Sequence, residues 1–423
     1  MVFGAFIDKT LFVCIETFGL LEEEFSMTDI KPFYITILLQ AINNMYDAGC
    51  SIAKKKQVFQ VNLLQGITFW LALIDLISAV CFLGNPQLQS VASRTQKWET
   101  LYPIDTYQQS TADANNYENG IVDGEKAQLP LDLAALYKKH GYKIIRNTPF
   151  GCNLTFDIAK AAIEGENLGK NTDTDLLTIS CSSTDYIGHQ VGVNAVETED
   201  CYLRLDQALA DFFAYLDKTI GKGNYLTFLT ADHGAVNNAA FLQDQRIPAG
   251  IWNGKSMVKE LNQELKAKFN TDKDLVMTIM NYQVFFNTAT IEEAGLDYAA
   301  VKQAVVNRLK KEKIVHYAFD MEKTSTESIP EQLKFRAING YNRERSGGVQ
   351  IVLKPAHYEY DVAKGTNHGA WNPYDIHIPL VFMGWHIQHG ATTQPHYMTD
   401  IAATVSALLH IQAPNGCIGT PIF

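Results

Sequence analysis

The alternation of apolar and polar positions becomes regular from about Lys97 onward, where it is typical of an α/β protein. Residues 175–181 and 225–230 are short apolar runs that predict buried strands. Between them, apolar side chains recur at helical spacing and predict one amphipathic helix, which Gly221 and Gly223 end. These side chains are Leu205, Leu209, Phe212, Phe213, Leu216 and Ile220. A strand, a helix and a second strand in this order form a crossover unit, which favours a mostly parallel sheet.

Two later apolar runs, residues 350–353 and 378–383, predict further strands. The stretch 247–346 is rich in charged residues and predicts a helical or mixed cap, inserted into the surrounding domain. We therefore expect an α/β fold over residues 97–423, with a mostly parallel central sheet and helices on both of its faces.

The first 96 residues differ from the rest, because their apolar runs do not alternate cleanly between strand and helix patterns. Residues 2–8 resemble a strand that ends in a carboxylate. The apolar run 11–21 is interrupted by Glu16 and is followed by no small-residue cleavage site, so no signal peptide is recognisable. Residues 1–96 are thus interpreted as an atypical N-terminal segment, and a truncation combined with a shifted reading frame is one explanation for it.

One segment of this region, residues 63–83, has the length of a membrane span. It holds 21 residues with one charge, Asp75, and follows the basic residues Lys54, Lys55 and Lys56. About 20 apolar residues cross a bilayer core, and basic flanks favour the cytoplasmic side. An unpaired carboxylate in mid-span is costly, however. Membrane contact through residues 63–83 is therefore not favoured, and a buried core helix or a segment without a native role is the alternative.

Composition narrows the class of protein further. With 423 residues, the chain is long enough for two or three domains, or for one large α/β domain with insertions. Hydrophobic residues make up 47% and charged residues 19%, which supplies a packed core and excludes wholesale disorder. A net charge of −11 argues against binding to a nucleic-acid polymer. The seven cysteines are widely spaced and form no CxxC motif, so they leave the redox compartment open.

Three clusters of aspartate and histidine lie next to predicted strands. Asp185 and His189 follow the first strand and are four residues apart, which lets them meet on one helical turn. Asp232 and His233 follow the next strand, and His368 lies in a loop before the last one. Strand ends of an α/β sheet meet at its ligand-binding edge, and catalytic zinc sites use three such nitrogen and oxygen ligands. Each cluster alone is ordinary loop chemistry, but their recurrence predicts a metal site.

Taken in chain order, these motifs resemble the alkaline phosphatase superfamily. The strings are STDYIGH at 183–189, TADHG at 230–234 and GTNHG at 365–369, followed by YDIHIPLVFMG. Further matches are WETLYP at 98–103, TPFG at 148–151 and YLRLD at 202–206. They are most similar to bacterial alkaline phosphatases with a threonine nucleophile, which are related to type I phosphodiesterases and nucleotide pyrophosphatases. The resemblance implies an alkaline-phosphatase-like fold and a hydrolase of small phosphate esters.

The resemblance also implies two zinc ions. Asp185, His189 and His368 match the ligands of one zinc, and Asp232 and His233 match two ligands of the other. In the family, one zinc stabilises the threonine nucleophile and the other neutralises the leaving-group oxygen, so that hydrolysis passes through a phosphoenzyme. Candidates to fix the imidazole tautomers through hydrogen bonds are Ser183, Thr184 and Asn367.

The N-terminal segment departs from the family pattern. The family's early zinc-ligating aspartate, its PTxTxP-like nucleophile loop and its phosphate-binding lysine and arginine are not recognisable here. Asp8 is a poor candidate for the missing ligand, because it lies only 177 residues before Asp185. The catalytic nucleophile is therefore unassigned, and the second zinc is left with two ligands. This leaves one zinc as an alternative to the family's two, and it predicts impaired or absent phosphatase activity.

Other functions remain open on the sequence alone. The chain is alternatively a phosphodiesterase or nucleotide pyrophosphatase, a catalytically inactive relative that binds metal, or a membrane-tethered protein without catalysis. Preference for a phosphate monoester or a diester is not predicted. The resemblance implies a periplasmic or otherwise exported protein, but localisation stays open because no signal peptide is recognisable.

Overall fold

A computed structural model describes residues 11–17, 95–122, 124–125, 128–171, 174–360 and 363–423. For residues 11–17 the description covers the backbone. The chain forms two compact units, Met1–Trp385 and His386–Phe423. Both the membrane-span candidate at 63–83 and the strand-like residues 2–8, which include Asp8, lie outside the described residues.

The first unit is built around a four-stranded sheet with the strand order β12-β5-β1-β4. Strands β1 (Leu11–Thr17), β4 (Asp175–Ser180) and β5 (Tyr225–Ala231) run parallel to one another. Strand β12 (Leu380–Gly384) pairs antiparallel with β5. The predicted α/β fold with a mostly parallel central sheet is confirmed, and the strands predicted at 175–181, 225–230 and 378–383 form within two residues of their expected bounds.

Strand β1 is the part of this sheet that the sequence did not predict. It lies between β4 and β5, with Leu11 level with Asp175 and Thr17 level with Ala231. A strand between two parallel neighbours typically lacks the alternating apolar pattern that identifies a half-buried strand. In this sequence no recognisable helix pattern follows the strand either, so β1 had no clear local signal. The atypical N-terminal segment therefore contributes a central strand to the α/β domain.

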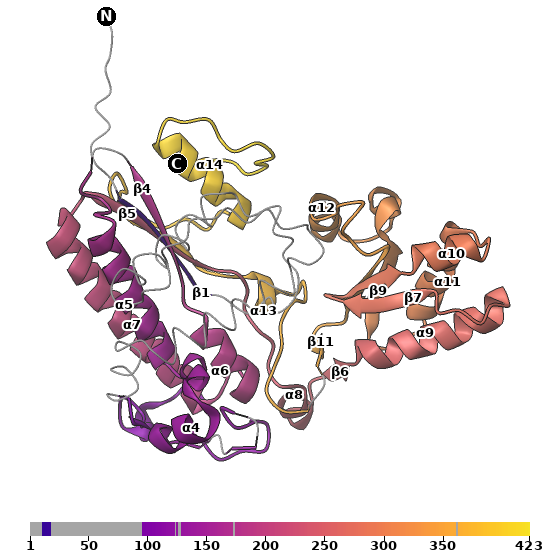
Figure 1. Cartoon of the computed structure of the whole chain (residues 1–423), viewed down its shortest axis with the longest axis horizontal. Helices are drawn as coiled ribbons and strands as arrows, with labels where there is room; N and C mark the ends of the chain where they lie inside the picture. The colour runs from indigo at the N-terminus through magenta and orange to yellow at the C-terminus, as the bar shows by residue number, and fades with distance from the viewer. Residues whose placement is uncertain (1–10, 18–94, 123, 126–127, 172–173, 361–362) are drawn as a thin grey trace, which may run out of the picture. The chain divides into compact units, whose positions relative to one another are not determined.

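Helices α5 (Phe150–Gly165) and α7 (Val196–Leu216) pack beside each other next to β4 (Figure 1). The apolar face predicted for the helix that forms as α7 is confirmed, because this face packs into the core. After α7 the chain continues through a π-helical turn at Asp217–Gly221. Residues of this core include Phe156, Ile163, Leu177, Ile179, Leu205, Phe212 and Leu216.

Two of the strings that carry the family resemblance meet at one buried carboxylate. The Asp200 side chain is 0% exposed and accepts hydrogen bonds from Trp98 Nε1 at 2.7 Å and the backbone N–H of Leu101 at 2.6 Å. It also accepts from the Tyr107 hydroxyl at 2.5 Å and from Arg204 Nε at 2.6 Å. WETLYP and YLRLD therefore serve to hold the segment around residue 100 against α7.

A second sheet, with the antiparallel order β7-β8-β10-β9, forms in and just after the expected cap. Its strands are β7 (Val276–Met280), β8 (Gln283–Phe286), β9 (Val315–Asp320) and β10 (Val349–Leu353). The strand predicted at 350–353 forms as β10, but it belongs to this sheet and not to the central one. Strand β10 belongs to the second sheet because it pairs with β9, with Val349 level with Asp320. This pairing joins distant segments, so the local sequence does not predict it. The domain boundaries at 96, 247 and 346 stay predictions.

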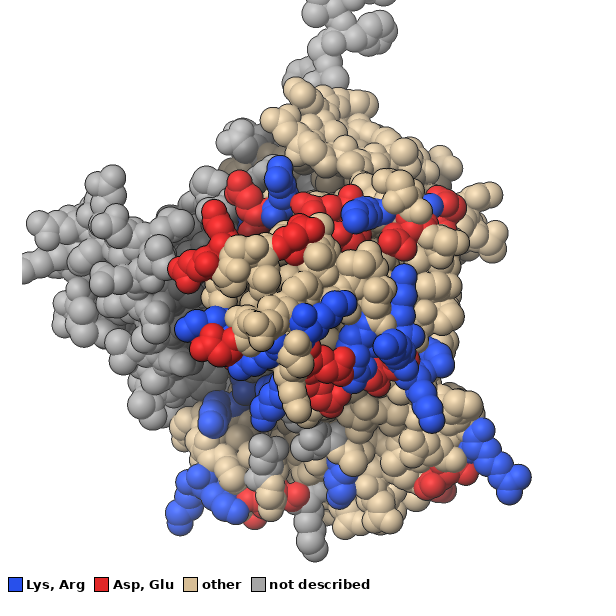
Figure 2. All heavy atoms as spheres, turned by 90° about the vertical axis from the view of Figure 1, so that its right-hand side faces the viewer, with Lys and Arg blue, Asp and Glu red and all other residues tan. Residues whose placement is uncertain are grey.

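Helices α9 (Gly254–Phe269) and α11 (Tyr298–Leu309) share the apolar core of this second sheet. Arg308 joins them at the surface through ion pairs with Glu260 at 2.9 Å and Glu264 at 2.6 Å. The face of this region in Figure 2 carries basic and acidic side chains interspersed. The charged residues of the stretch 247–346 therefore lie on a solvated surface (Figure 2) and form local ion pairs.

Apart from 3₁₀ helices at Ile104–Thr106, Tyr142–Asn147 and Met321–Thr326, shorter strands and α-helices complete the described structure. In Met1–Trp385 they are β2 (Lys97–Trp98), β3 (Leu131–Asp132), α4 (Leu133–His140), α6 (Ser183–Val191), α8 (Ala239–Asp244), β6 (Gly250–Trp252), α10 (Thr288–Glu293), α12 (Glu331–Asn339), β11 (His357–Glu359) and α13 (Pro373–Ile376). The unit His386–Phe423 contains α14 (Met398–Leu408). Among the described helices, none has both the length and the apolar character needed to cross a membrane.

Candidate metal site

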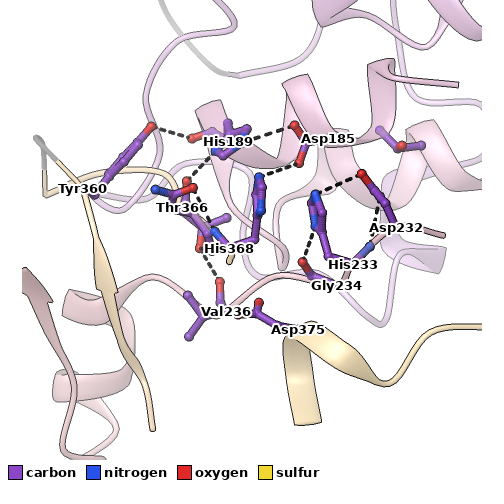
Figure 3. Close-up of polar contacts among 12 residues, drawn as sticks. Asp185, His189, Asp232, His233, Gly234, Val236, Tyr360, Thr366, His368 and Asp375 are labelled. Carbon is purple, nitrogen blue, oxygen red and sulfur yellow. Dashed lines mark hydrogen bonds and ion pairs between the residues drawn. The ribbon is translucent and has the colours of Figure 1, made fainter. Parts of the chain in front are cut away.

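The three predicted aspartate and histidine clusters meet at one place in the structure (Figure 3). Helix α6 begins directly after β4 and carries Asp185 and His189 one helical turn apart, so both side chains lie on the same face. Asp232 and His233 follow the last residue of β5, and His368 comes from the loop before α13. The parallel strands therefore bring residues from distant parts of the sequence to a shared edge.

Asp185 lies between two imidazoles. Its Oδ2 is 3.2 Å from His189 Nε2, and its Oδ1 is 3.8 Å from His368 Nε2. The His368 ring stacks on the His233 ring with centroids 3.5 Å apart and an interplanar angle of 11°. His233 Nε2 in turn lies 3.4 Å from Asp232 Oδ2. All five predicted ligands thus form one continuous group.

The closest set of possible ligand atoms combines residues from both of the predicted zinc-ligand sets. One atom each from Asp185, His233 and His368 lies within 4.8 Å of the others. The sequence had placed His233 with Asp232, apart from the other two. Adjoining ligand sets are what a two-metal site requires, since its ions lie roughly 3.5–4 Å apart.

Backbone carbonyls hold two of the imidazoles in one tautomer. His189 Nδ1 lies 2.9 Å from the carbonyl oxygen of Thr366, and His233 Nδ1 lies 2.7 Å from that of Gly234. A carbonyl oxygen only accepts, so each Nδ1 carries the hydrogen and leaves the Nε2 lone pair for a metal. Two of the three side-chain candidates make other hydrogen bonds: Thr184 donates to the carbonyl of Cys181, and Asn367 accepts from the backbone N–H of His368.

The donor set fits a metal on chemical grounds. His233 Nε2 is buried and makes no hydrogen bond within the described residues. Burial, together with the neighbouring His233, lowers the pKa of His368 to about 3, so the imidazole is neutral as a metal ligand must be. Aspartate oxygens and neutral histidine nitrogens are ligands that zinc accepts.

Asp375, which follows the third cluster, links two loops of the site. Its backbone carbonyl accepts from the N–H of Gly234 at 2.6 Å, and its Oδ2 accepts from the N–H of Ala370 at 2.6 Å. The side chain is 2% exposed, and this burial raises its pKa to about 7. His377, two residues later, is exposed. Asp375 therefore positions the loops that carry His233 and His368.

Glycines in two of the motifs permit close approaches of the backbone. Gly365 has a φ of +73°, and a Cβ there would lie 2.1 Å from the carbonyl oxygen of His189. At Gly234, a Cβ would lie 2.1 Å from the carbonyl oxygen of Tyr374. Both positions exclude larger residues, because the clashing atoms belong to backbone and cannot swing away.

Replacing Gly365 with alanine is expected to lower the free energy of unfolding by at least about 2 kcal/mol, since a left-handed alanine and a backbone clash add their costs. We expect metal binding to weaken as well, because His189 and Thr366 must move apart. Urea denaturation and a zinc titration measure the two effects. Gly390→Ala is the matched control, because no atom lies within 4 Å of the added Cβ. Equal stability of the two variants would contradict the account.

The fold and the site together define an α/β protein of the alkaline phosphatase type, with candidate metal ligands at the edge of its parallel strands. The family described as type I phosphodiesterase / nucleotide pyrophosphatase matches residues 91–375, and the chain belongs to this family. The match begins near residue 96, where the sequence pattern changes.

Three curated proteins are similar to this chain over most of its length. The chain is 49% identical over 330 residues to a protein of Myroides odoratus named calcium-transporting ATPase. It is 47% identical over 327 residues to alkaline phosphatase PafA of Elizabethkingia meningoseptica. It is also 47% identical over 337 residues to alkaline phosphatase PhoV of Synechococcus elongatus. Each match covers 77% of this chain but only 58–60% of the relative. This chain therefore spans about three fifths of their length.

A solved structure supports the fold assignment. The crystal structure of wild-type alkaline phosphatase PafA superposes with a TM-score of 0.76 at 45% sequence identity. The match covers 79% of this chain and 64% of that one. The predicted resemblance to the alkaline phosphatase superfamily is confirmed.

Proposed function

We propose that the chain is a metal-dependent hydrolase of small phosphate esters, with zinc as its metal and with impaired activity. The observation that carries this proposal is the convergence of Asp185, His189, Asp232, His233 and His368 at one edge of the sheet. Family membership and the two alkaline phosphatases among the relatives support the reaction type.

The five predicted ligands divide into two groups in the proposed hydrolysis. Asp185, His189 and His368 would hold one zinc, and Asp232 with His233 would contribute to a second. Zinc at such ligands supplies positive charge for the phosphate oxygens and lowers the pKa of a bound water. The neutral His368 imidazole cancels none of that positive charge, which matters in a chain with a net charge of −11.

The proposed impairment follows from the unassigned nucleophile. The upstream residues 18–94, where the family pattern would place it, lie outside the described residues. Only two ligands, Asp232 and His233, are recognised for the second zinc, which is fewer than the three protein ligands that a catalytic zinc usually has. A catalytically inactive relative that binds metal is therefore the second candidate, and a phosphodiesterase or nucleotide pyrophosphatase differs from the first only in substrate.

Hydrolysis of p-nitrophenyl phosphate and bis(p-nitrophenyl) phosphate separates these candidates. We expect slow hydrolysis of at least one ester that requires zinc, is removed by chelation and disappears in His368→Ala. Asp272→Ala is the control, since Asp272 is an exposed carboxylate in another part of the fold. Zinc binding without any turnover would establish the inactive relative. Turnover that survives in His368→Ala would show that it does not arise at this site.

A further inference from the structure

Two buried carboxylates outside the metal site lack a compensating partner. Glu197, in the first turn of α7, is 0% exposed, and neither of its oxygens makes a hydrogen bond within the described residues. Glu118 is 5% exposed; its Oε1 accepts from Asn115 Nδ2 at 2.5 Å, whereas its Oε2 has no hydrogen-bond partner there. A buried carboxylate is unfavourable unless a proton or a cation offsets its charge.

Glu118 lines a small cavity of about 20 Å³. Thr111, Asn115 and Asn237 line it too, and Asn237 Oδ1 is a second buried oxygen without a hydrogen-bond partner in the described structure. A volume of this size holds one water molecule or one ion. The unpartnered atoms around the cavity are oxygens, which bind hard cations.

The surrounding charges also favour a cation. Burial first, and then the neighbouring carboxylates, raise the pKa of Glu197 to about 9; the largest of these repulsions comes from Glu118. Burial likewise raises the pKa of Glu118 to about 7, with Asp113 adding to the effect. The basic side chain that acts on Glu118 is Lys364, which is exposed and only partly offsets this.

We propose that this cavity, called the Glu118 site, binds one calcium ion through Glu118 Oε2 and Asn237 Oδ1, with Glu197 balancing the charge. Calcium takes six to eight oxygen ligands in flexible geometry and accepts amide and carbonyl oxygens readily. Magnesium demands a near-ideal octahedron, and zinc prefers nitrogen and sulfur. The proposal does not depend on whether the chain hydrolyses phosphate esters.

The Glu118 site adjoins the segments that carry the zinc ligands. The N–H of Gly365 donates to the carbonyl of Tyr117 at 2.7 Å, and the N–H of Asn119 donates to the carbonyl of Gln190 at 2.9 Å. Gln190 directly follows His189. Calcium would therefore fix residues 117–119 against the two segments that hold His189 and His368.

Thermal denaturation of the zinc-loaded chain with and without calcium tests the proposal. At calcium concentrations about 100-fold above its Kd, we expect the Tm to rise by roughly 5 °C, with little response to the same concentration of magnesium. Glu118→Gln should abolish the rise, because it keeps the shape of the side chain but removes its charge. Glu293→Gln, at an exposed position on α10, is the matched control and should respond as the wild type does.

Equilibrium dialysis with calcium provides a second readout, in case Glu118→Gln does not fold. One calcium per wild-type chain is expected, retained in Asp185→Ala and lost in Asn237→Ala. The proposal is overturned if calcium neither binds nor raises the Tm. It is also overturned if Glu118→Gln or Asn237→Ala binds calcium as tightly as the wild type, or if magnesium acts equally well.

The pH dependence gives an independent check. Without calcium, the folded state holds protons on Glu118 and Glu197 that the unfolded state releases above its ordinary carboxyl pKa near 4.5. Stability from this source is therefore full below about pH 4.5 and is lost as the pH rises toward 9. Asp113, Asp200 and Lys364 are the other charged groups that act on the pair. Calcium replaces these protons, so the calcium-induced rise in Tm should grow with pH; a rise that is independent of pH would contradict the assignment.

Discussion

Asp185→Ala is expected to weaken zinc binding by more than about 100-fold. Loss of a group that merely orients a ligand typically costs 10- to 100-fold in metal affinity, and Asp185 would be a ligand itself. It also lies between His189 and His368, at 3.2 and 3.8 Å, so its removal leaves both imidazoles without their shared carboxylate. Competition with a fluorescent zinc chelator measures the change in affinity directly.

The variant should fold, because Asp185 is only partly buried and belongs to none of the apolar cores formed by the described residues. Zinc should accordingly raise the Tm of the wild type but not that of Asp185→Ala. Asp272→Ala serves as the control for the removal of one negative charge. An affinity within a few-fold of the wild type in Asp185→Ala would show that zinc binds elsewhere.

Asp200→Asn is expected to lower the free energy of unfolding by about 3–5 kcal/mol, the cost of breaking a buried, hydrogen-bonded ion pair. The carboxylate accepts from Trp98, Leu101, Tyr107 and Arg204, and an amide cannot accept from all four. Its NH₂ group would also face donors and leave at least one of them buried and unpaired. Urea denaturation followed by far-UV circular dichroism measures the loss.

Asp206→Asn is the matched control, since Asp206 is an exposed residue on the same helix. It should change the free energy of unfolding by less than about 0.5 kcal/mol. A comparably small effect of Asp200→Asn would mean that the segment around Trp98 is not held by this carboxylate.

The parts of the fold that could be predicted are those with a local signal. The apolar runs of β4 and β5 and the helical spacing in α7 identify their elements without knowledge of any partner. Strand β1 and the place of β10 depend on pairing with strands far away in the sequence. Neither register nor sheet membership can be derived from a seven-residue or a five-residue strand alone.

The candidate site shows the same division. Motif spacing and the family resemblance named all five residues that the structure brings together, from Asp185 to His368. They did not reveal the carbonyls of Thr366 and Gly234 that fix the imidazole tautomers, because backbone groups are present at every position. The Glu118 site was missed as well, since its carboxylate and amide lie 119 residues apart and acquire meaning only through burial.

The zinc content of the purified chain, measured by elemental analysis after dialysis against metal-free buffer, tests the central claim most directly. The account predicts one tightly held zinc per chain, absent from Asp185→Ala. A second zinc that depends on Asp232 would show that a residue of the N-terminal segment completes the other half of the site. No zinc above background in the wild type, or the same amount in Asp185→Ala, would contradict the account.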